Sequence, residues 1–361
     1  MKLELTILFT YRNRELERVK IAMDSLVAQS DSNFEVLFID YGSNLEHSKA
    51  LQELLNNYSF VTYFYSYHID QPWSRAKAVN IGIQLVKTPY VFVSDIDMIF
   101  KPNFIEIVQQ LKDPKVSVYF KVGFLNQSES KKNQPFEDYS ISFSSKPGAQ
   151  GLSLFPVEAL KKVRGFDEFL HFWGAEDEDV HNRLLQVGYE VNFYEKEILL
   201  LHRWHPTYRN SESDVVTKNL QLHSITKLNQ EYFAYKRDRK VLTANANNWG
   251  VPISKEDYEV LTSTDVTRVI LNNKEYMYLF LFVELPRLED GVIAVEFRED
   301  PFQHSLKYFL KKKLGKSVSS YYTLKEINDL VLLHLIFFYP NHLYSFTVGA
   351  DLKSIQLKLK K

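Results

Sequence analysis

The segment from Gly165 to Asp179 joins a glycine-punctuated aromatic loop to four consecutive acids: Glu176, Asp177, Glu178 and Asp179. Apolar residues follow at helical spacing, so the acids are predicted to lie in the first turn of a helix. Free N–H groups and the dipole at a helix N-terminus favour ionised carboxylates. An ionised carboxylate beside an exposed Trp173 could bind a sugar face and deprotonate one of its hydroxyls. An acidic cap on an ordinary surface helix would have the same pattern.

Two further carboxylates, Asp95 and Asp97, stand two residues apart at the end of an apolar run. Side chains alternate along a strand, so both are predicted to face the same side. One could ligate a divalent cation, which prefers oxygen ligands, and the other could reach a ribose hydroxyl or a metal-bound water. Asp-x-Asp is also common by chance, and its place at the end of a buried strand is what favours function.

His202 and His205 are three residues apart, directly after the apolar run 198–201. Both could ligate one metal ion together with Asp97, although two ordinary histidines in a surface turn would have the same spacing. Because the chain contains no cysteine, any metal must be held by histidine and carboxylate.

The polar residues named above must be positioned by a framework, and the sequence predicts one in which strands and helices alternate. The apolar runs 3–9, 34–40, 60–67 and 88–100 read as strands, and the segments 15–29, 47–56 and 75–86 read as helices. This order predicts an α/β fold with a mostly parallel sheet. Ligands bind beyond the carboxyl ends of such strands, where residues 10–14, 40–43 and 95–97 should converge. Neither a GxGxxG nor a GxxxxGK[ST] motif is present, which argues against dinucleotide-binding and P-loop proteins.

Composition excludes several classes of protein. With 44 basic and 45 acidic residues the formal net charge is -1, so no bulk charge recruits nucleic acid. The first residues lack the apolar core of a signal peptide, and no apolar run approaches the roughly 20 residues of a membrane helix. We therefore expect a cytoplasmic protein, with the inner face of the membrane as a second location.

The 361 residues suffice for one large domain and a smaller one. We predict a catalytic domain over 1–243 with a helical extension at 210–243, a linker at 244–254, and an accessory domain at 255–361. Within the accessory domain we expect a strand at 276–285, a helix at 326–339 and a strand at 347–358. No catalytic constellation is evident there.

Lysines 311–313 lie beside Phe302, Leu306, Phe309 and Leu310 in a basic amphipathic stretch. Such a stretch could lie on a membrane that carries a lipid-linked acceptor. The solvated face of a packed helix is the commoner explanation of the pattern.

Six segments, in order, resemble the beta-1,4-galactosyltransferases and related bacterial glycosyltransferases that build polysaccharides. Residues 11–14 resemble the family's Phe-Arg-Asn-Arg, residues 74–82 its Asn-Arg-Ala-Lys-x-x-Asn-x-Gly helix, and residues 92–97 its Phe-Ser-Asp-Val-Asp motif. Residues 121–124 are similar to its Lys-Phe-Gly-Phe, residues 165–179 to its Gly-Phe…Trp-Gly-Gly-Glu-Asp-Asp-Asp, and residues 182–184 continue the match. The resemblance covers roughly residues 3–210.

The resemblance implies a GT-A fold, a UDP-sugar donor, a saccharide or lipid-linked glycan acceptor, and Mn²⁺ or Mg²⁺. Asp177 would be the catalytic base and Glu176 would hold donor or acceptor hydroxyls. The implied metal ligands are Asp97, His202 and His205, and the implied acceptor site contains Trp173, Gly151 and Gly174. The implied donor site contains Thr10, Tyr11, Arg12, Arg14, Asp40, Arg75, Asn80, Ser94, Asp95 and Lys121.

Three departures from the family are visible. A histidine, His202, replaces the family's methionine ligand, and Ala175 replaces the second glycine after the tryptophan, which would add a methyl beside the acceptor. Residues 40–43 instead resemble the Asp-Asp-Gly-Ser of glycosyltransferase family two. The expected activity is metal-dependent, inverting transfer of a hexose or N-acetylhexosamine. An inactive sugar-binding relative and a retaining transferase remain as alternatives, and the choice of sugar rests on one or two cleft side chains.

Overall fold

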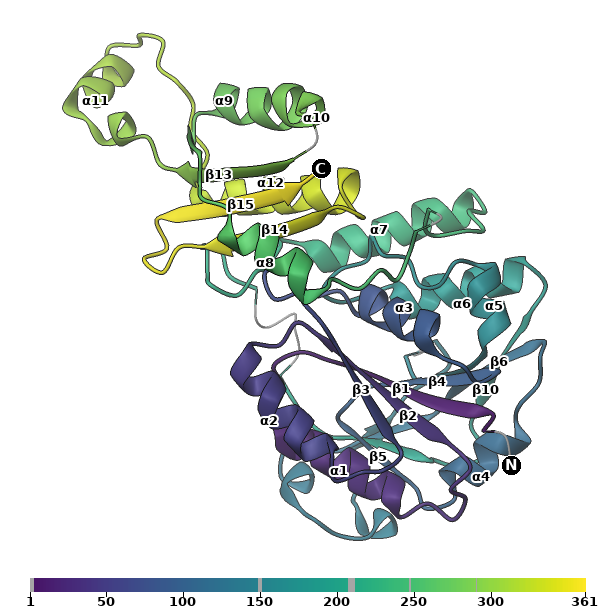
Figure 1. Ribbon diagram of the computed structural model, residues 1–361. Coiled ribbons are helices and arrows are strands. Elements are labelled where there is room, and N and C mark those ends of the chain that lie inside the picture. The colour runs from purple at the N-terminus through teal and green to yellow at the C-terminus, as the bar shows by residue number, and fades with distance from the viewer. Residues whose placement is uncertain (1–2, 149–150, 207–211, 247, 290) are drawn as a thin grey trace. The chain divides into compact units, whose positions relative to one another are not determined.

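The computed structural model describes residues 3–148, 151–206, 212–246, 248–289 and 291–361 (Figure 1). The chain forms two compact units. The first comprises Met1–Ser66, Ser74–Asn210 and Thr226–Pro252, and the second comprises Tyr67–Trp73, Ser211–Ile225 and Ile253–Lys361. Within the described residues, no helix combines the length and the apolar character needed to cross a membrane.

A seven-stranded sheet forms the centre of the first unit, in the order β10-β6-β9-β4-β1-β2-β3. Only β9 runs antiparallel to its neighbours β4 and β6, whereas the other pairs are parallel. The predicted α/β class with a mostly parallel sheet is therefore confirmed. The strands are β1 (Leu5–Tyr11), β2 (Glu35–Tyr41), β3 (Val61–Ser66), β4 (Tyr90–Ser94), β6 (Val116–Phe120), β9 (Ser153–Pro156) and β10 (Glu190–Tyr194).

Helices cover both faces of this sheet (Figure 1). On one face, Leu5, Ile7 and Phe9 of β1 share a core with α1 (Leu16–Val27), α2 (Leu45–Leu55) and α4 (Phe104–Gln110). On the other face, α3 (Arg75–Leu85) packs on β1 and β2. A Cβ atom at Gly82 would lie 2.3 Å from Leu8 Cδ1, so this glycine allows the close approach of α3. Helix α3 thereby begins, with Arg75, near the carboxyl ends of the parallel strands.

A small second sheet has the order β5-β11-β7-β8. Its strands are β5 (Met98–Phe100), β11 (Leu200–His202), β7 (Val122–Phe124) and β8 (Phe143–Ser144). The predicted single strand 88–100 is thus wrong, since residues 95–97 leave β4 and the chain enters the other sheet as β5. The period-two argument for Asp95 and Asp97 fails with it, because neither carboxylate belongs to a strand. An apolar run long enough for one strand can also hold two strands and a turn.

The second unit contains a four-stranded sheet in the order β12-β13-β15-β14. Its strands are β12 (Arg268–Leu271), β13 (Val292–Arg298), β15 (Ser354–Lys360) and β14 (Leu343–Val348), with α8 (Lys255–Ser263) and α12 (Leu324–Phe338) packed on it. Helix α12 confirms the predicted helix at 326–339 and begins with a capping box of Thr323 and Glu326. The predicted strand 347–358 is divided by a turn into β14 and β15.

The predicted strand at 276–285 is wrong. This segment is helical, as α9 (Lys274–Tyr278), a π-helical turn η4 (Leu279–Glu284) and α10 (Leu285–Arg287). The buried residues Met277, Phe280 and Leu281 recur at helical spacing, and Asn273 caps the start by accepting from Glu275 N–H at 3.0 Å. Aromatic residues favour strands on average, but helical packing decides here.

The predicted domain boundaries also change. The expected helical extension 210–243 is helical only in α7 (Ile225–Asp238), and residues 210 and 211 lie outside the described part. The expected linker 244–254 is part of the first unit up to Pro252. Trp249 in this segment is buried, Asn245 donates to the Arg164 carbonyl and Gly250 N–H donates to Glu168 Oε1, so the segment packs on the first unit rather than spacing two domains.

Candidate active site

Arg75 joins three segments that are far apart in the sequence. Its guanidinium donates to Asp95 Oδ1 at 3.1 Å, to Asp177 Oδ1 at 2.8 Å and to the Gly151 carbonyl at 2.9 Å. Ser74 caps α3 by accepting from Lys77 N–H at 3.2 Å, which fixes where the arginine begins the helix. These contacts bring four predicted site residues together. The absence of a side chain at Gly151 avoids a tight contact, because a Cβ atom there would lie 3.3 Å from Asp177 Oδ2.

Helix α6 (Glu176–Gln186) opens with all four acids in its first turn, as predicted. Their ionisation differs from the expectation. Burial, with the neighbouring charge of Asp177, raises the pKa of Glu176 to about 7, and Arg75 only partly opposes this. Burial also raises the pKa of Asp177 above its ordinary value, against the pull of Arg75. Desolvation outweighs the helix dipole here, which brings both acids closer to the range useful for proton transfer.

The loop before α6 presents Trp173 to solvent, with 44% of its surface exposed. Phe172, Gly174 and Ala175 around it all have positive φ angles, of 64°, 104° and 73°. For Phe172 and Ala175 this conformation is strained, and such strain is concentrated at functional sites. The methyl of Ala175 lies in a buried cluster with Leu170 and Phe233. That this methyl also lies beside the acceptor stays a prediction.

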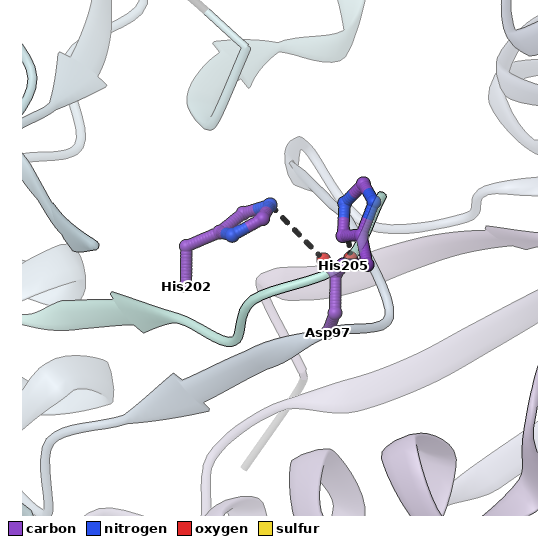
Figure 2. Close-up of side chains that lie close together, drawn as sticks. All are labelled: Asp97, His202 and His205. Atoms are coloured by element: carbon purple, nitrogen blue, oxygen red, sulfur yellow. Dashed lines mark ion pairs between the residues drawn. The ribbon is translucent and has the colours of Figure 1, made fainter. Parts of the chain in front are cut away.

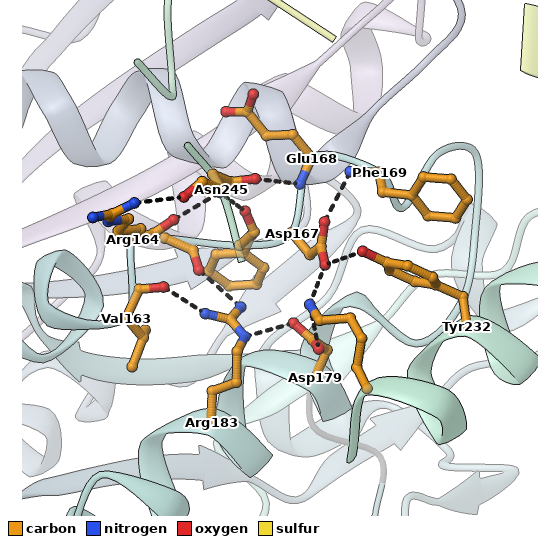
Figure 3. Close-up of polar contacts among 12 residues, drawn as sticks. Val163, Arg164, Asp167, Glu168, Phe169, Asp179, Arg183, Tyr232 and Asn245 are labelled. Carbon is orange, nitrogen blue, oxygen red and sulfur yellow. Dashed lines mark hydrogen bonds and ion pairs between the residues drawn. The ribbon is translucent and has the colours of Figure 1, made fainter. Parts of the chain in front are cut away.

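A buried ion network holds this loop against α6 and α7 (Figure 3). Lys236 on α7 pairs with Asp167 and lies 3.2 Å from Asp179, while Arg183 pairs with Asp179 at 2.8 Å. The other guanidinium nitrogens of Arg183 donate to the carbonyls of Val163 and Gly165, each at 2.8 Å. Asp179, one of the four acids in the first turn of α6, is thus a buried member of this network and not an exposed acid on a surface helix.

Two asparagines complete the support of residues 164–168, and Figure 3 shows one of them, Asn245. Asn245 donates to the carbonyls of Arg164 and Phe166 at 2.7 and 2.6 Å and accepts from Glu168 N–H at 3.0 Å. Asn80 accepts from Phe166 N–H at 2.8 Å and donates to Glu168 Oε1 at 2.9 Å. Asn80 is fully buried and holds the loop, and its role toward the donor stays a prediction. Asn245 lies in the segment that was predicted to be a linker. The turn propensity of that segment favoured the linker prediction, so the hydrogen-bonding role of Asn245 was missed.

Asp97, His202 and His205 form the second cluster of the site (Figure 2). His205 Nε2 lies 3.0 Å from Asp97 Oδ2, and His202 Nε2 lies 3.7 Å from Asp97 Oδ1. The approach follows from the small sheet, because His202 on β11 pairs with Met98 on β5. Arg203 N–H donates to the Asp97 carbonyl at 2.9 Å, which continues the pairing past the strand end.

The donor set of this cluster fits a divalent metal. One potential ligand atom from each residue lies within 4.8 Å of the others. Asp97 Oδ1 is buried without a hydrogen-bond partner, and His205 Nδ1 is 2.8 Å from the Pro206 carbonyl, which leaves Nε2 directed at Asp97. Burial favours a raised pKa for Asp97, but the two histidines outweigh it and lower the pKa to about 2. The group therefore combines an ionised oxygen with two imidazoles, ligands suited to a transition-metal ion.

Residues that steady this cluster were not found from the sequence. Phe124 lies against the His202 ring, with the two centroids 4.9 Å apart. Ser130 Oγ accepts from Trp204 N–H at 2.7 Å, and its carbonyl accepts from Arg203. Ser130 lies more than 70 positions from its partners and belongs to no motif, so no local signal could have identified it.

The remaining predicted donor residues lie at the ends of neighbouring strands. Phe9 pairs with Ser94, so Thr10 on β1 and Asp95 after β4 leave the sheet side by side. The Tyr11 hydroxyl bonds to the Arg14 carbonyl and to His47, which fixes the turn that carries Arg12 and Arg14.

Asp40, Ser94 and Lys121 have structural contacts of their own. Asp40 is fully buried and accepts from Ser43 N–H at 2.8 Å and from the Tyr63 hydroxyl at 2.9 Å. Ser94 is buried at the end of β4, and Lys121 lies between β6 and β7. The roles of these residues toward a donor stay predictions.

Two known protein families match this arrangement of segments. Residues 6–158 match the family described as glycosyl transferase family 2, and residues 134–205 match the family described as the N-terminal domain of galactosyltransferase. Both matched families are glycosyltransferases. The predicted resemblance is thereby confirmed, and the two matches together extend from β1 to His205.

Two relatives show the same class. The chain is 29% identical over 149 residues to chondroitin sulfate synthase 3 from Homo sapiens, which covers 37% of this chain and 17% of that protein. It is 27% identical over 202 residues to an "uncharacterized glycosyltransferase" from Haemophilus influenzae, which covers 52% of this chain and 65% of that protein. The match thus spans less than two thirds of either relative. The solved structure of GalNAc-T7 with UDP, GalNAc and Mn²⁺ has a TM-score of 0.44 and 16% identity, covering 66% of this chain and 51% of that one.

Proposed function

We propose that this glycosyltransferase is a metal-dependent inverting hexosyltransferase that uses a UDP-sugar donor. It would move a hexose or N-acetylhexosamine to a sugar hydroxyl of a growing glycan. The observation that carries the proposal is the position of Arg75 between Asp95 and Asp177. Asp95 contacts Arg75 and belongs to the same turn as Asp97. Arg75 and Asp95 therefore connect the candidate base, Asp177, to the candidate metal site.

The chain's own residues can supply the base for a single displacement. Arg75 holds Oδ1 of Asp177, so Oδ2 is the atom that takes the proton of the acceptor hydroxyl. The acceptor oxygen then bonds to the anomeric carbon as the bond from that carbon to the phosphate oxygen breaks. The electron pair leaves on UDP, and the configuration at the anomeric carbon is inverted. No enzyme nucleophile is required.

The leaving group determines the role of the second cluster. Asp97, His202 and His205 would hold a divalent ion, which when bound supplies positive charge for the departing diphosphate. Arg75 contributes fixed positive charge near the same turn. Trp173, exposed in the loop that precedes α6, offers an apolar face on which the acceptor sugar can stack.

The acceptor belongs to the same proposal. A relative named chondroitin sulfate synthase 3 points to a glycosaminoglycan-like or other polysaccharide chain as the acceptor class. Glu176, buried beside Asp177, would be protonated part of the time near neutral pH and could then donate a hydrogen bond to a sugar oxygen.

The donor and the metal can be tested together. We expect one of UDP-galactose, UDP-N-acetylgalactosamine, UDP-glucose and UDP-N-acetylglucosamine to raise the melting temperature in the presence of Mn²⁺. A ligand at a hundred times its Kd stabilises by about 2.7 kcal/mol, which is readily measured. The same donor should release UDP with Mn²⁺ and not with EDTA. In the variant His205→Ala, the UDP release that depends on Mn²⁺ should be lost. Equal UDP release with Mn²⁺ and with EDTA would contradict metal use.

A further inference from the structure

Helix α11 (Leu306–Lys313) of the second unit exposes its apolar side chains. Leu306, Phe309 and Leu310 are 83%, 72% and 60% exposed, and Leu314 directly after the helix is 70% exposed. No described residue of α11 is buried. A helix packed on a core would bury such a stripe. The commoner explanation of this sequence pattern, the solvated face of a packed helix, is therefore contradicted by the structure.

The helix contacts the rest of the second unit through its opposite side. The ring of Tyr308 lies 5.9 Å from that of Phe302 and 5.7 Å from that of Tyr321. Tyr308 is two residues from both Leu306 and Leu310, about half a helical turn. The side of α11 that carries Tyr308 and the side that carries Leu306 and Leu310 thus face in different directions. The apolar stripe therefore takes no part in the contact that Tyr308 makes with the second unit.

The charge around the stripe has one sign. The segment 301–320 contains five lysines and no acidic residue: Lys307, Lys311, Lys312, Lys313 and Lys316. The whole chain has a net charge of -1, so this concentration is local. A symmetric contact between two copies of α11 would bring these lysines together, which is unfavourable. An anionic lipid surface accepts apolar side chains below the headgroups and lysines among them.

We propose that α11 is an interfacial membrane-binding helix that recognises anionic phospholipids. Leu306, Phe309, Leu310 and Leu314 would enter the boundary between headgroups and acyl chains. The lysines would remain with the lipid phosphates and add electrostatic attraction. This surface takes no part in sugar transfer, so the proposal does not depend on the proposed function.

Vesicle sedimentation with the full chain tests the proposal. We expect binding to phosphatidylcholine vesicles that contain about 30% phosphatidylglycerol, and much weaker binding to pure phosphatidylcholine vesicles. The variant K311Q/K312Q/K313Q should weaken binding about 100-fold, since each lysine near an anionic surface contributes about one fivefold factor. F309Q/L310Q should weaken it at least about tenfold, because both side chains lose their apolar insertion.

Matched controls separate this surface from general effects. K87Q/K196Q/K353Q removes three exposed lysines elsewhere and should bind within about twofold of the wild type, because the remaining attraction is local. Both α11 variants should keep the wild-type melting temperature, since none of the altered side chains is buried. Absence of wild-type binding to anionic vesicles, or an equal loss in the control, would overturn the proposal. So would a dimer that F309Q/L310Q dissociates without any vesicle binding, which would make the stripe an interface between copies.

Discussion

At the scale of single residues, the candidate site depends on how Arg75 divides its donors. One nitrogen holds Asp95, a second holds Asp177 and a third holds the Gly151 carbonyl. The rigid fork of a guanidinium can serve three acceptors at once, which a lysine cannot do with fixed geometry. The arginine therefore orients the proposed base while it leaves one carboxylate oxygen of Asp177 for the acceptor.

Glu176 gives this site a characteristic pH dependence. Its pKa is raised to about 7 in the folded protein, mainly by burial, against an ordinary 4.5. The folded state therefore retains a proton that the unfolded state loses. The stabilisation is fully present below pH about 4.5 and is lost as the pH rises through about 7.

We therefore expect Glu176→Gln to be more stable than the wild type at pH 8, by on the order of 1–3 kcal/mol. The advantage should shrink as the pH falls and reach zero below about pH 4.5, where the wild-type carboxyl is protonated in both states. Urea unfolding of both proteins without metal or donor, at several pH values, measures the difference. A stability difference that does not change with pH would contradict the raised pKa.

At the scale of elements, α7 acts as a support for the aromatic loop. Lys236 reaches Asp167 in the loop and Asp179 in α6, and Asn229 donates to the carbonyls of His171 and Trp173 at 2.9 and 3.1 Å. The loop contains strained residues on either side of Trp173 and Gly174, so it needs external contacts to keep one conformation. These contacts come from a region that the sequence marked only as a helical extension.

Removing one partner from this network should be costly. We expect Lys236→Met to destabilise the protein by about 3–5 kcal/mol, because it leaves the buried Asp167 without its cation and leaves Asp179 with Arg183 alone. Chemical denaturation measures this change. Lys227→Met, at an exposed position of the same helix, is the matched control and should change stability by less than about 0.5 kcal/mol. Equal effects of the two substitutions would show that the network does not hold the loop.

The elements also show which predictions a sequence permits. The alternation of strands and helices up to residue 94 was correct because its apolar periods are long and regular, as in β1 and α1. The break at Asp95–Asp97 was missed, because the apolar run continues through it. The helix at 274–287 was taken for a strand, because its aromatic residues have high strand propensity. In both cases contacts distant in sequence made the choice.

At the scale of the whole molecule, catalytic and accessory tasks are assigned to different units. The first unit contains the glycosyltransferase match and both candidate clusters. The second unit includes residues 67–73, which lie between β3 and α3 in the sequence, and it contains α11. The metal cluster was predictable because its residues have recognisable ligand chemistry, whereas its supports Ser130 and Phe124 do not. No catalytic constellation was predicted in residues 255–361, so the proposed role of α11 rests on exposure and charge alone.

The most direct test of the account is the reaction of the variant Asp177→Asn with the donor found by the UDP-sugar screen. The asparagine can still accept a hydrogen bond from Arg75 but cannot act as a base at neutral pH. We predict that transfer to an acceptor falls by at least about 100-fold, while donor affinity in the presence of Mn²⁺ stays within about threefold. Glu178→Gln, in the same helical turn, should retain wild-type transfer, and NMR of the wild-type product should show an inverted anomeric configuration. An Asp177→Asn variant with full transfer activity, or a product with retained configuration, would contradict the account.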